Sequence, residues 1–391
     1  MEFIHWRADN DVLYIELIGK IDTTNALAVE QEIMAVRGEH AGQRIVLDAE
    51  KLDYISSAGL RVILRLRKLE KTLSLINASL AVYEVLEMTG FTDMLPVKKA
   101  YRRLSIEGCE MIGRGAAGAV YRYDAETIVK VYHNADALDE IQRERELSKK
   151  AFVRGINTAI PYDVVWVGDG YGTVAELLEA KSISKLIRAN PEDLETPARY
   201  FVDMAKNIHA THLEKGELPD MKALALNWVD FLKPHLPADQ WEKLHKLVSE
   251  VPERDTMMHG DYHTNNIMVR NGETLLIDMD TLCMGHPIFE LGSMFNAFVG
   301  FSEVNPEPAE KSFLGFSFET ACKFWRLSLA MYLGTENEEV IRSVEEKAMI
   351  VGYTRMLRRT LRRNLVDGPE RIARCKEMLA ILLEKVDTLD F

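Results

Sequence analysis

The most informative segment of the sequence is Met258-His259-Gly260-Asp261-Tyr262-His263-Thr264-Asn265-Asn266-Ile267-Met268, followed by Leu275-Leu276-Ile277-Asp278. An acid follows His-Gly, an asparagine comes five residues later, and a second acid ends a short apolar run. This layout favours phosphoryl transfer. Asp261 would face an attacking hydroxyl, while Asn266 and Asp278 would hold Mg²⁺ against the phosphates of a nucleotide.

A glycine-rich segment lies upstream, at Gly113-Arg114-Gly115-Ala116-Ala117-Gly118-Ala119-Val120. Glycines in this pattern occur both in dinucleotide-binding folds, where a helix follows, and in kinase-like folds, where a strand follows. The residues after Gly118 favour a strand, and a turn at 124–126 leads to a further strand that carries Lys130. The order therefore predicts a phosphate-binding loop at Gly113, Gly115 and Gly118, with Lys130 contacting the phosphates.

An acid is needed on the following helix, predicted over 135–153, to hold Lys130 forward. Glu144 and Glu146 both compete for this role, and the distance from Glu144 to the next loop favours Glu144. A hairpin over 164–178 then ends in Glu176-Leu177-Leu178. In a kinase-like fold this segment is the hinge, so we expect Glu176 and Leu178 beside the adenine.

The chain after residue 104 resembles the aminoglycoside phosphotransferase and choline kinase branch of the protein-kinase-like fold. The resemblance rests on His259-Gly260-Asp261, on Ile277-Asp278 and on Gly285-His286-Pro287 through Glu290-Leu291, where the family has aspartate at position 290. It implies a bilobal fold with an N-lobe over 104–180 and a large helical C-lobe over 181–391. It also implies ATP and Mg²⁺ as cofactors, and a loop-supporting role for His259.

The first 100 residues predict a separate α/β domain, a small mixed sheet with helices on it. Thr23 or Thr24 would cap its first helix, and Ser56-Ser57 the second. The segment Tyr54-Ile55-Ser56-Ser57-Ala58-Gly59-Leu60-Arg61 is similar to that of STAS domains, the fold of anti-sigma factor antagonists. The resemblance implies that Ser57 is a phosphorylation switch. Ser56 stands where the family usually has aspartate, and the two serines could equally be plain helix caps.

Charge and hydropathy argue against two classes of partner, nucleic acids and membranes. The net charge of −13 argues against nucleic-acid binding, and no apolar run approaches the roughly 20 residues that a membrane helix needs. The start of the chain has no basic and apolar leader, so a cytoplasmic protein with no membrane partner is the expectation. Cys109, Cys283, Cys322 and Cys375 have no metal-binding spacing and are expected to be reduced thiols.

The last third of the sequence predicts helices. Pro191 is expected at the first position of one of them. Five arginines recur at helical spacing, and they indicate either an acid-binding face near the acceptor or a solvated face with ion pairs one turn apart. They are Arg355, Arg358, Arg359, Arg362 and Arg363.

The sequence therefore predicts an α/β domain followed by an α+β, kinase-like phosphotransferase that acts on an alcohol group. The acceptor is either a hydroxyl-bearing small molecule, with the STAS module regulating the enzyme or binding a protein partner, or a protein serine, including Ser57 itself. A non-catalytic scaffold that senses the nucleotide is the third hypothesis.

Overall fold

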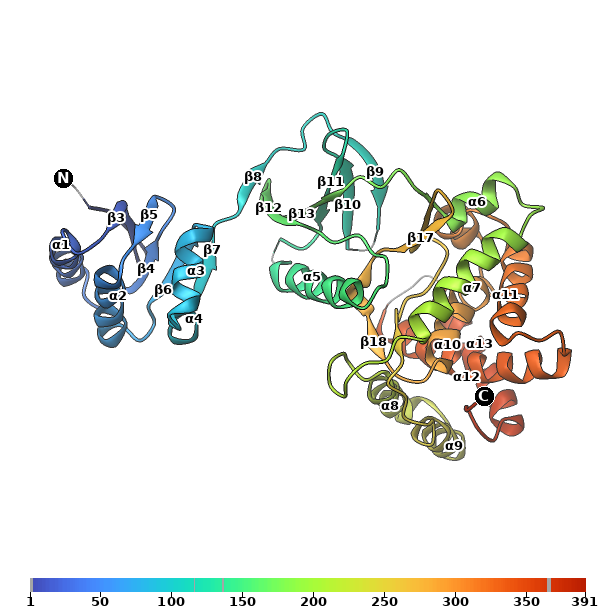
Figure 1. Ribbon diagram of the computed structural model, residues 1–391. Helices are drawn as coiled ribbons and strands as arrows, with labels where there is room; N and C mark the ends of the chain where they lie inside the picture. Colours follow the sequence, from blue (N-terminus) through green and yellow to red (C-terminus); the bar gives the residue numbers. More distant parts are fainter. Residues whose placement is uncertain (1–2, 116, 136, 364–366) are drawn as a thin grey trace. The chain divides into compact units, whose positions relative to one another are not determined.

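The computed structural model describes residues 3–115, 117–135, 137–363 and 367–391, and the chain divides into two compact units (Figure 1). The first unit is Met1–Ser105 with Val164–Asp169, and the second is Ile106–Asp163 with Gly170–Phe391. The division of the second unit into lobes near residue 180 remains a prediction.

The first unit contains a five-stranded mixed sheet in the order β1-β2-β4-β6-β7. Strands β1 and β2 are antiparallel, whereas β2–β4, β4–β6 and β6–β7 are parallel pairs, as a sheet with helical crossovers requires. The strands are β1 (Ile4–Asp9), β2 (Val12–Leu17), β4 (Arg44–Asp48), β6 (Ser74–Ala78) and β7 (Val97–Lys99), with a separate short pair β3 (Gly19–Ile21) and β5 (Leu52–Ile55).

Four helices accompany this sheet: α1 (Ala26–Glu39), α2 (Ser57–Leu69), α3 (Leu80–Met88) and α4 (Phe91–Met94). Their buried side chains form one core with those of the strands. Helix α2 begins against the β3–β5 pair so closely that a Cβ atom at Gly59 would lie 2.7 Å from Ile55 Cγ1 and 2.8 Å from Ile21 Cγ2. Gly59 therefore fixes how near the start of α2 lies to the strands.

The expected cap of α1 is wrong. Asn25 precedes the first helical residue and makes no side-chain capping bond. The Thr24 amide and hydroxyl both donate to the Asp22 carboxylate, at 2.8 and 2.6 Å. Thr24 therefore bonds to the turn before the helix and not to the first N–H groups of α1.

The second unit begins with an antiparallel sheet that contains β13, β11, β10 and β9 in that order. Its strands are β9 (Glu110–Arg114), β10 (Gly118–Arg122), β11 (Thr127–Tyr132) and β13 (Gly170–Glu176), and helix α5 (Leu138–Val153) follows β11. Strand β12 (Asp163–Val167) pairs in parallel with β8 (Arg102–Leu104), which explains why 164–169 group with the first unit.

The rest of the second unit is mainly helical, as the resemblance implied, and is drawn in green to red in Figure 1. Its helices share one hydrophobic core. They are α6 (Ile183–Ala189), α7 (Glu195–His209), α8 (Met221–Leu232), α9 (Ala238–Ser249), α10 (Ile288–Phe295), α11 (Phe318–Leu333), α12 (Glu338–Arg362) and α13 (Gly368–Lys385). One short strand, β14 (Lys181–Ser182), lies just before α6. Four more lie between α9 and α10: β15 (Met257–Met258), β16 (Ile267–Arg270), β17 (Glu273–Leu276) and β18 (Cys283–Met284).

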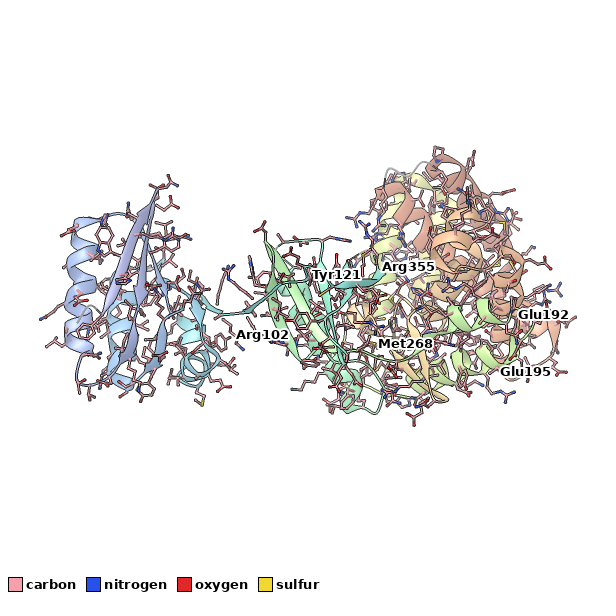
Figure 2. The ribbon with its side chains drawn as sticks, turned by 90° about the horizontal axis from the view of Figure 1, so that it is seen from above. Arg102, Tyr121, Glu192, Glu195, Met268 and Arg355 are labelled. Atoms are coloured by element: carbon pink, nitrogen blue, oxygen red, sulfur yellow. The ribbon has the colours of Figure 1, made fainter. Side chains whose placement is uncertain are left out.

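The predicted helix start at Pro191 is wrong. Pro191 and Glu192 lie in a turn, and α7 begins at Glu195; Figure 2 labels both glutamates. The Asp193 carboxylate accepts from the Thr196 amide at 3.1 Å, so an acid just before the helix satisfies one of its free N–H groups. This side-chain bond places the helix start after the proline.

All four cysteines are free thiols, and Cys283 and Cys375 are buried. Across the described ranges, no helix combines the length and the apolar character needed to cross a bilayer.

Candidate functional site

Lys130 lies at the centre of the site, on the inner strand β11. Its Nζ atom is 3.0 Å from each carboxylate oxygen of Glu144 and 3.4 Å from Asp278 Oδ1. Burial alone would lower the pKa of Lys130, but the two carboxylates more than offset it and hold that pKa above its ordinary value. The lysine is therefore a fixed positive charge between the sheet and the helical part of the second unit.

Glu144, and not Glu146, is the acid that holds this lysine. Glu144 is buried on α5, and the Tyr132 hydroxyl donates to its Oε2 atom at 2.7 Å. Glu146, two residues later on the same helix, is exposed. Burial and the nearby charge of Glu144 raise the pKa of Tyr132, which keeps its hydroxyl a donor.

The three glycines of the loop between β9 and β10 differ in what surrounds them. A Cβ atom at Gly118 would lie 2.2 Å from the Val131 carbonyl oxygen, so only glycine lets β10 approach β11. At Gly113 and Gly115 the nearest atoms to such a Cβ would be 3.8 and 4.0 Å away. The backbone at these two positions is therefore open to a ligand, whereas Gly118 is required by the sheet.

The expected hinge follows β13. The Leu177 amide donates to the Glu126 carbonyl at 2.7 Å, and the Leu178 carbonyl accepts from the Ala180 amide at 2.8 Å. Within the described residues the Leu178 amide has no hydrogen-bond partner, so it can donate to an adenine ring. Glu176 is exposed and its carboxylate is 3.4 Å from Arg270, which indicates a surface ion pair and not a base contact through its side chain.

Asp261 follows the buried strand β15, and its side chain is about half exposed. Its carboxylate lies 3.6 Å from His263 Nε2 through one oxygen and 4.0 Å from Arg355 through the other. Burial would raise the pKa of Asp261, but the neighbouring His263 and Arg355 side chains lower it well below its usual range. Asp261 is therefore an ionised hydrogen-bond acceptor that is open to solvent.

Asn266 and Asp278 are held next to each other by the backbone. The Ile277 amide donates to the Asn266 carbonyl at 2.9 Å, and Asn266 Nδ2 donates to the Asp261 carbonyl at 3.0 Å. The second bond turns the amide so that its Oδ1 atom is the group left for a cation. Asp278 adopts a left-handed conformation with φ of 65°, which is uncommon outside glycine and often found at functional positions.

These two side chains offer one amide oxygen and one carboxylate, the hard oxygen ligands that Mg²⁺ prefers. Mg²⁺ usually takes one or two carboxylates, with water and substrate phosphates filling its other positions. The described residues contain no cluster of three or more His, Cys, Asp or Glu side chains able to enclose a metal ion. Loss of solvent raises the pKa of the neighbouring Asp280 to about 6, and the charges of Asp278 and Glu144 contribute to the rise.

The loop that carries Asp261 is tied to the helical core by a carboxylate. Glu290, on α10, is 1% exposed and accepts from the His259 amide at 2.6 Å and the Gly260 amide at 3.0 Å. The His259 ring faces the Ile277 carbonyl at 3.0 Å through Nε2, and the Thr281 hydroxyl donates to the His259 carbonyl. These bonds give His259 and Glu290 a structural part in the loop.

Gly260 has φ of 82°, and a Cβ atom there would lie 2.3 Å from the Thr281 carbonyl oxygen. Its own carbonyl accepts from Arg355 at 2.8 Å and from the Ser293 hydroxyl at 3.3 Å. Sequence reasoning did not identify Ser293 or the contact of Arg355 with this loop. The helical spacing of the arginines from Arg355 onwards was the one sequence feature that pointed to Arg355. No sequence feature pointed to Ser293.

The structure thus brings Lys130, Glu144 and Asp278 into direct contact, and joins Asp261 to Asn266 through the loop. Ser57 belongs to the other unit and is described by itself. It is the exposed first residue of α2, whereas Ser56 is the cap and accepts from the Ala58 amide at 3.2 Å.

Comparisons with known proteins agree with both parts of this description. A model of the STAS domain matches residues 4–104, and a model of the phosphotransferase enzyme family matches residues 108–317, more than half of the chain. BtrV of Bordetella bronchiseptica, provisionally named an anti-sigma factor antagonist, is 41% identical over 85 residues, which are 21% of this chain and 72% of BtrV.

Two solved structures are similar over most of their length. ADP-bound aminoglycoside phosphotransferase APH(2'')-Ib matches with 14% identity and a TM-score of 0.49, over 77% of this chain and 98% of its own. A choline/ethanolamine kinase family protein of Mesorhizobium loti matches with 16% identity and a TM-score of 0.45, over 71% of this chain and 92% of its own. From its family match and the site just described, the chain belongs to the phosphotransferase enzyme family and carries a STAS domain ahead of its kinase-like fold.

Proposed function

We propose that the second unit transfers the γ-phosphate of ATP to a hydroxyl acceptor with the help of Mg²⁺. The observation that carries this proposal is the contact of Lys130 with both Glu144 and Asp278. A lysine held by a buried glutamate and facing a carboxylate after a short strand is the arrangement that phosphoryl transfer requires.

Each side chain has a defined part in this reaction. Lys130 binds the phosphates, held at the correct height by Glu144, while the Leu178 amide donates to the adenine. Asn266 Oδ1 and Asp278 would hold Mg²⁺, which supplies neutralisation of phosphate charge when bound. Asp261, ionised at neutral pH, accepts a hydrogen bond from the acceptor hydroxyl and orients it towards the phosphate.

Position and charge account for catalysis here, and no covalent enzyme intermediate is required. The His259–Glu290 bonds keep the loop in place, so that Asp261 does not have to be ordered when substrate binds. His263 and Arg355 keep the Asp261 carboxylate ionised, which favours its role as acceptor of a hydrogen bond.

The experiment is ADP formation and nucleotide binding by the purified chain with Mg-ATP. We expect Asp261→Ala to bind ATP as the wild type does and to lose turnover, whereas Asp278→Ala loses Mg-dependent binding as well. Wild-type turnover in either variant would disprove the assignment. ATP binding with no turnover for any acceptor would instead favour a nucleotide-sensing scaffold.

One observation favours a second role, in which the kinase-like unit phosphorylates a serine. Ser57 is exposed at the first position of α2, and Ser56 already serves as the cap, so the Ser57 hydroxyl is not needed to start the helix. A phosphate at this position would lie beside free backbone N–H groups and the positive end of the helix dipole. In this reading the STAS module binds a protein partner, and phosphorylation of Ser57 changes that binding.

A further inference from the structure

The face of α12 beside Asp261 carries several arginines. Arg355, labelled in Figure 2, is partly buried and its Nη1 atom donates to the Gly260 carbonyl at 2.8 Å and to the Ser293 hydroxyl at 2.9 Å. Its other terminal nitrogen lies 4.0 Å from Asp261 Oδ1. The interpretation of these arginines as a solvated helix face is therefore wrong for Arg355, which is built into the site.

The next arginines along the helix continue this face. The Arg358 guanidinium lies 5.9 Å from the ring centre of Phe231, and that of Arg359 lies 5.2 Å from the ring centre of Phe301. The Arg358 Nε atom is buried and has no hydrogen-bond partner. Both guanidinium groups are therefore within cation–π distance of an aromatic ring, and Arg359 is exposed, so its donors can reach a ligand.

Acidic partners occur nearby but are used elsewhere. Arg371 is paired with Asp367, and Glu303 accepts from the Tyr353 hydroxyl and lies 3.4 Å from Arg374. Throughout the described part of the chain, no carboxylate lies within ion-pair distance of Arg358, Arg359, Arg362 or Arg363. The protein has 61 acidic residues against 48 basic ones, so a group of unpaired arginines at the site is not explained by composition.

The charges of this group act on one another. Burial lowers the pKa of Arg359, and Arg363 and Arg355 lower it further, while Asp261 raises it. Arg359 is therefore within electrostatic reach of both Arg355 and the catalytic carboxylate. Like charges held together at a site cost free energy that a bound anion would return.

We propose that the acceptor is an anionic hydroxyl compound, whose phosphate or carboxylate group binds Arg359 and its neighbours while its hydroxyl faces Asp261. This inference rests on the proposed phosphotransferase function. Arg359 is one helical turn from Arg355, about 6 Å along the axis, so the anionic group and the reacting hydroxyl belong to the same small molecule or to neighbouring positions of one chain. An acceptor with a cationic group would be repelled by the same surface.

The test uses the full chain with its nucleotide site filled by saturating Mg-AMP-PNP. Binding of glycerol 3-phosphate, glycerol and ethanolamine is measured by calorimetry, with inorganic phosphate as the anion alone. We expect glycerol 3-phosphate to bind at least tenfold more tightly than glycerol, and ethanolamine to bind least. Arg359→Gln should weaken the binding of glycerol 3-phosphate at least tenfold and leave the binding of glycerol unchanged.

Arg342→Gln is the matched control, because Arg342 is an exposed arginine more than four turns away on the same helix. It should bind all four probes as the wild type does. Equal affinity for glycerol 3-phosphate and glycerol, or an Arg359→Gln variant that binds the anions as tightly as the wild type, would overturn the proposal. Salt should weaken the anionic probes alone.

A second arm separates an acceptor anion from the phosphates of the nucleotide. Binding of inorganic phosphate is repeated without AMP-PNP, in the wild type, in Arg359→Gln and in Lys130→Met. Phosphate binding that is lost in Arg359→Gln and kept in Lys130→Met supports an acceptor site. Phosphate binding that is lost only in Lys130→Met contradicts the acceptor site. Failure of AMP-PNP to bind would refute the proposed function, while this arm would still test the arginine group by itself.

Discussion

The Lys130 Nζ atom lies 3.0 Å from each carboxylate oxygen of Glu144, so the two side chains form a two-oxygen ion pair. Lys130 lies on β11 and Glu144 on α5, the helix that follows this strand. The pair is shielded, because the Glu144 side chain is only 11% exposed and that of Lys130 20%. Its geometry fixes the position of the Lys130 ammonium group on the inner strand β11.

Replacing Glu144 by glutamine should reduce kcat/KM for ATP about 10- to 100-fold, since a hydrogen bond to a charged group contributes about 1.5–3 kcal/mol. The matched control is Glu146→Gln, which changes an exposed glutamate on the same helix and should leave the rate unchanged. Steady-state ADP formation measures both. Equal losses in the two variants would show that the pair does not position the lysine.

Glu290→Ala should destabilise the second unit by about 2–5 kcal/mol, because each of two buried amides, of His259 and Gly260, would lose its acceptor. Chemical denaturation measures the loss. Glu307→Ala, at an exposed pair with Lys311, should stay within about 0.5 kcal/mol of the wild type. If Glu290→Ala unfolds as the wild type does, the loop is not held by this carboxylate.

Gly118→Ala and Gly115→Ala should separate structure from ligand binding in the glycine-rich loop. Alanine at Gly118 would place its Cβ 2.2 Å from a backbone oxygen, so strands β10 and β11 must move apart, at a cost of about 1–3 kcal/mol. Alanine at Gly115 meets no atom closer than 4.0 Å and should change ATP affinity more than the melting temperature. Similar melting temperatures for both variants would contradict this division.

Asp280 predicts a pH dependence of stability. Its folded pKa of about 6 lies above the ordinary 3.8, so the folded state binds more protons than the unfolded state between these values, and stability falls as pH rises through that window. Asp280→Asn removes the effect. In urea denaturation without nucleotide or Mg²⁺, the free energy of unfolding of the variant should therefore exceed that of the wild type by an amount that grows from about pH 4 to about pH 7. A difference that stays constant over that range would show that Asp280 ionises normally.

The two serines of the STAS domain should respond differently. Ser56→Ala removes a helix cap and should cost about 0.5–2 kcal/mol, without preventing phosphorylation. Ser57→Ala should leave stability unchanged and abolish any phosphate gained on incubation with Mg-ATP, measured as intact mass. A phosphate that persists in Ser57→Ala lies on another residue and would exclude Ser57 as the switch.

Motifs predicted the fold class better than local signals predicted where each helix begins. The order of glycines, Lys130, Asp261, Asn266 and Asp278 indicated the kinase-like fold, because each of these residue types is tied to one backbone or phosphate contact. Helix starts failed where a carboxylate formed a nearer bond than the expected cap, as Asp22 and Asp193 did. Such competition depends on local geometry that composition does not encode.

Long-range partners could not be predicted from one sequence. In the sequence, Glu290 was noticeable only because the family has aspartate at this position. In the structure, its carboxylate accepts two hydrogen bonds from the loop of Asp261. Arg355 is separated from Gly260 by 95 positions, and its periodic spacing favoured a solvated helix face over an acid-binding face. Only the packing of α10 and α12 against the loop distinguishes these cases.

The bonds from Glu290, Ser293 and Arg355 to residues 259 and 260 have a consequence for the motions of the protein. All three partners come from helices of the largest hydrophobic core, so the loop has no independent way to detach from them. Loops at ligand-binding sites are usually among the first segments of a protein to open locally. Here the loop of Asp261 would open only together with the helices behind it, so its local opening should be as rare as that of the core.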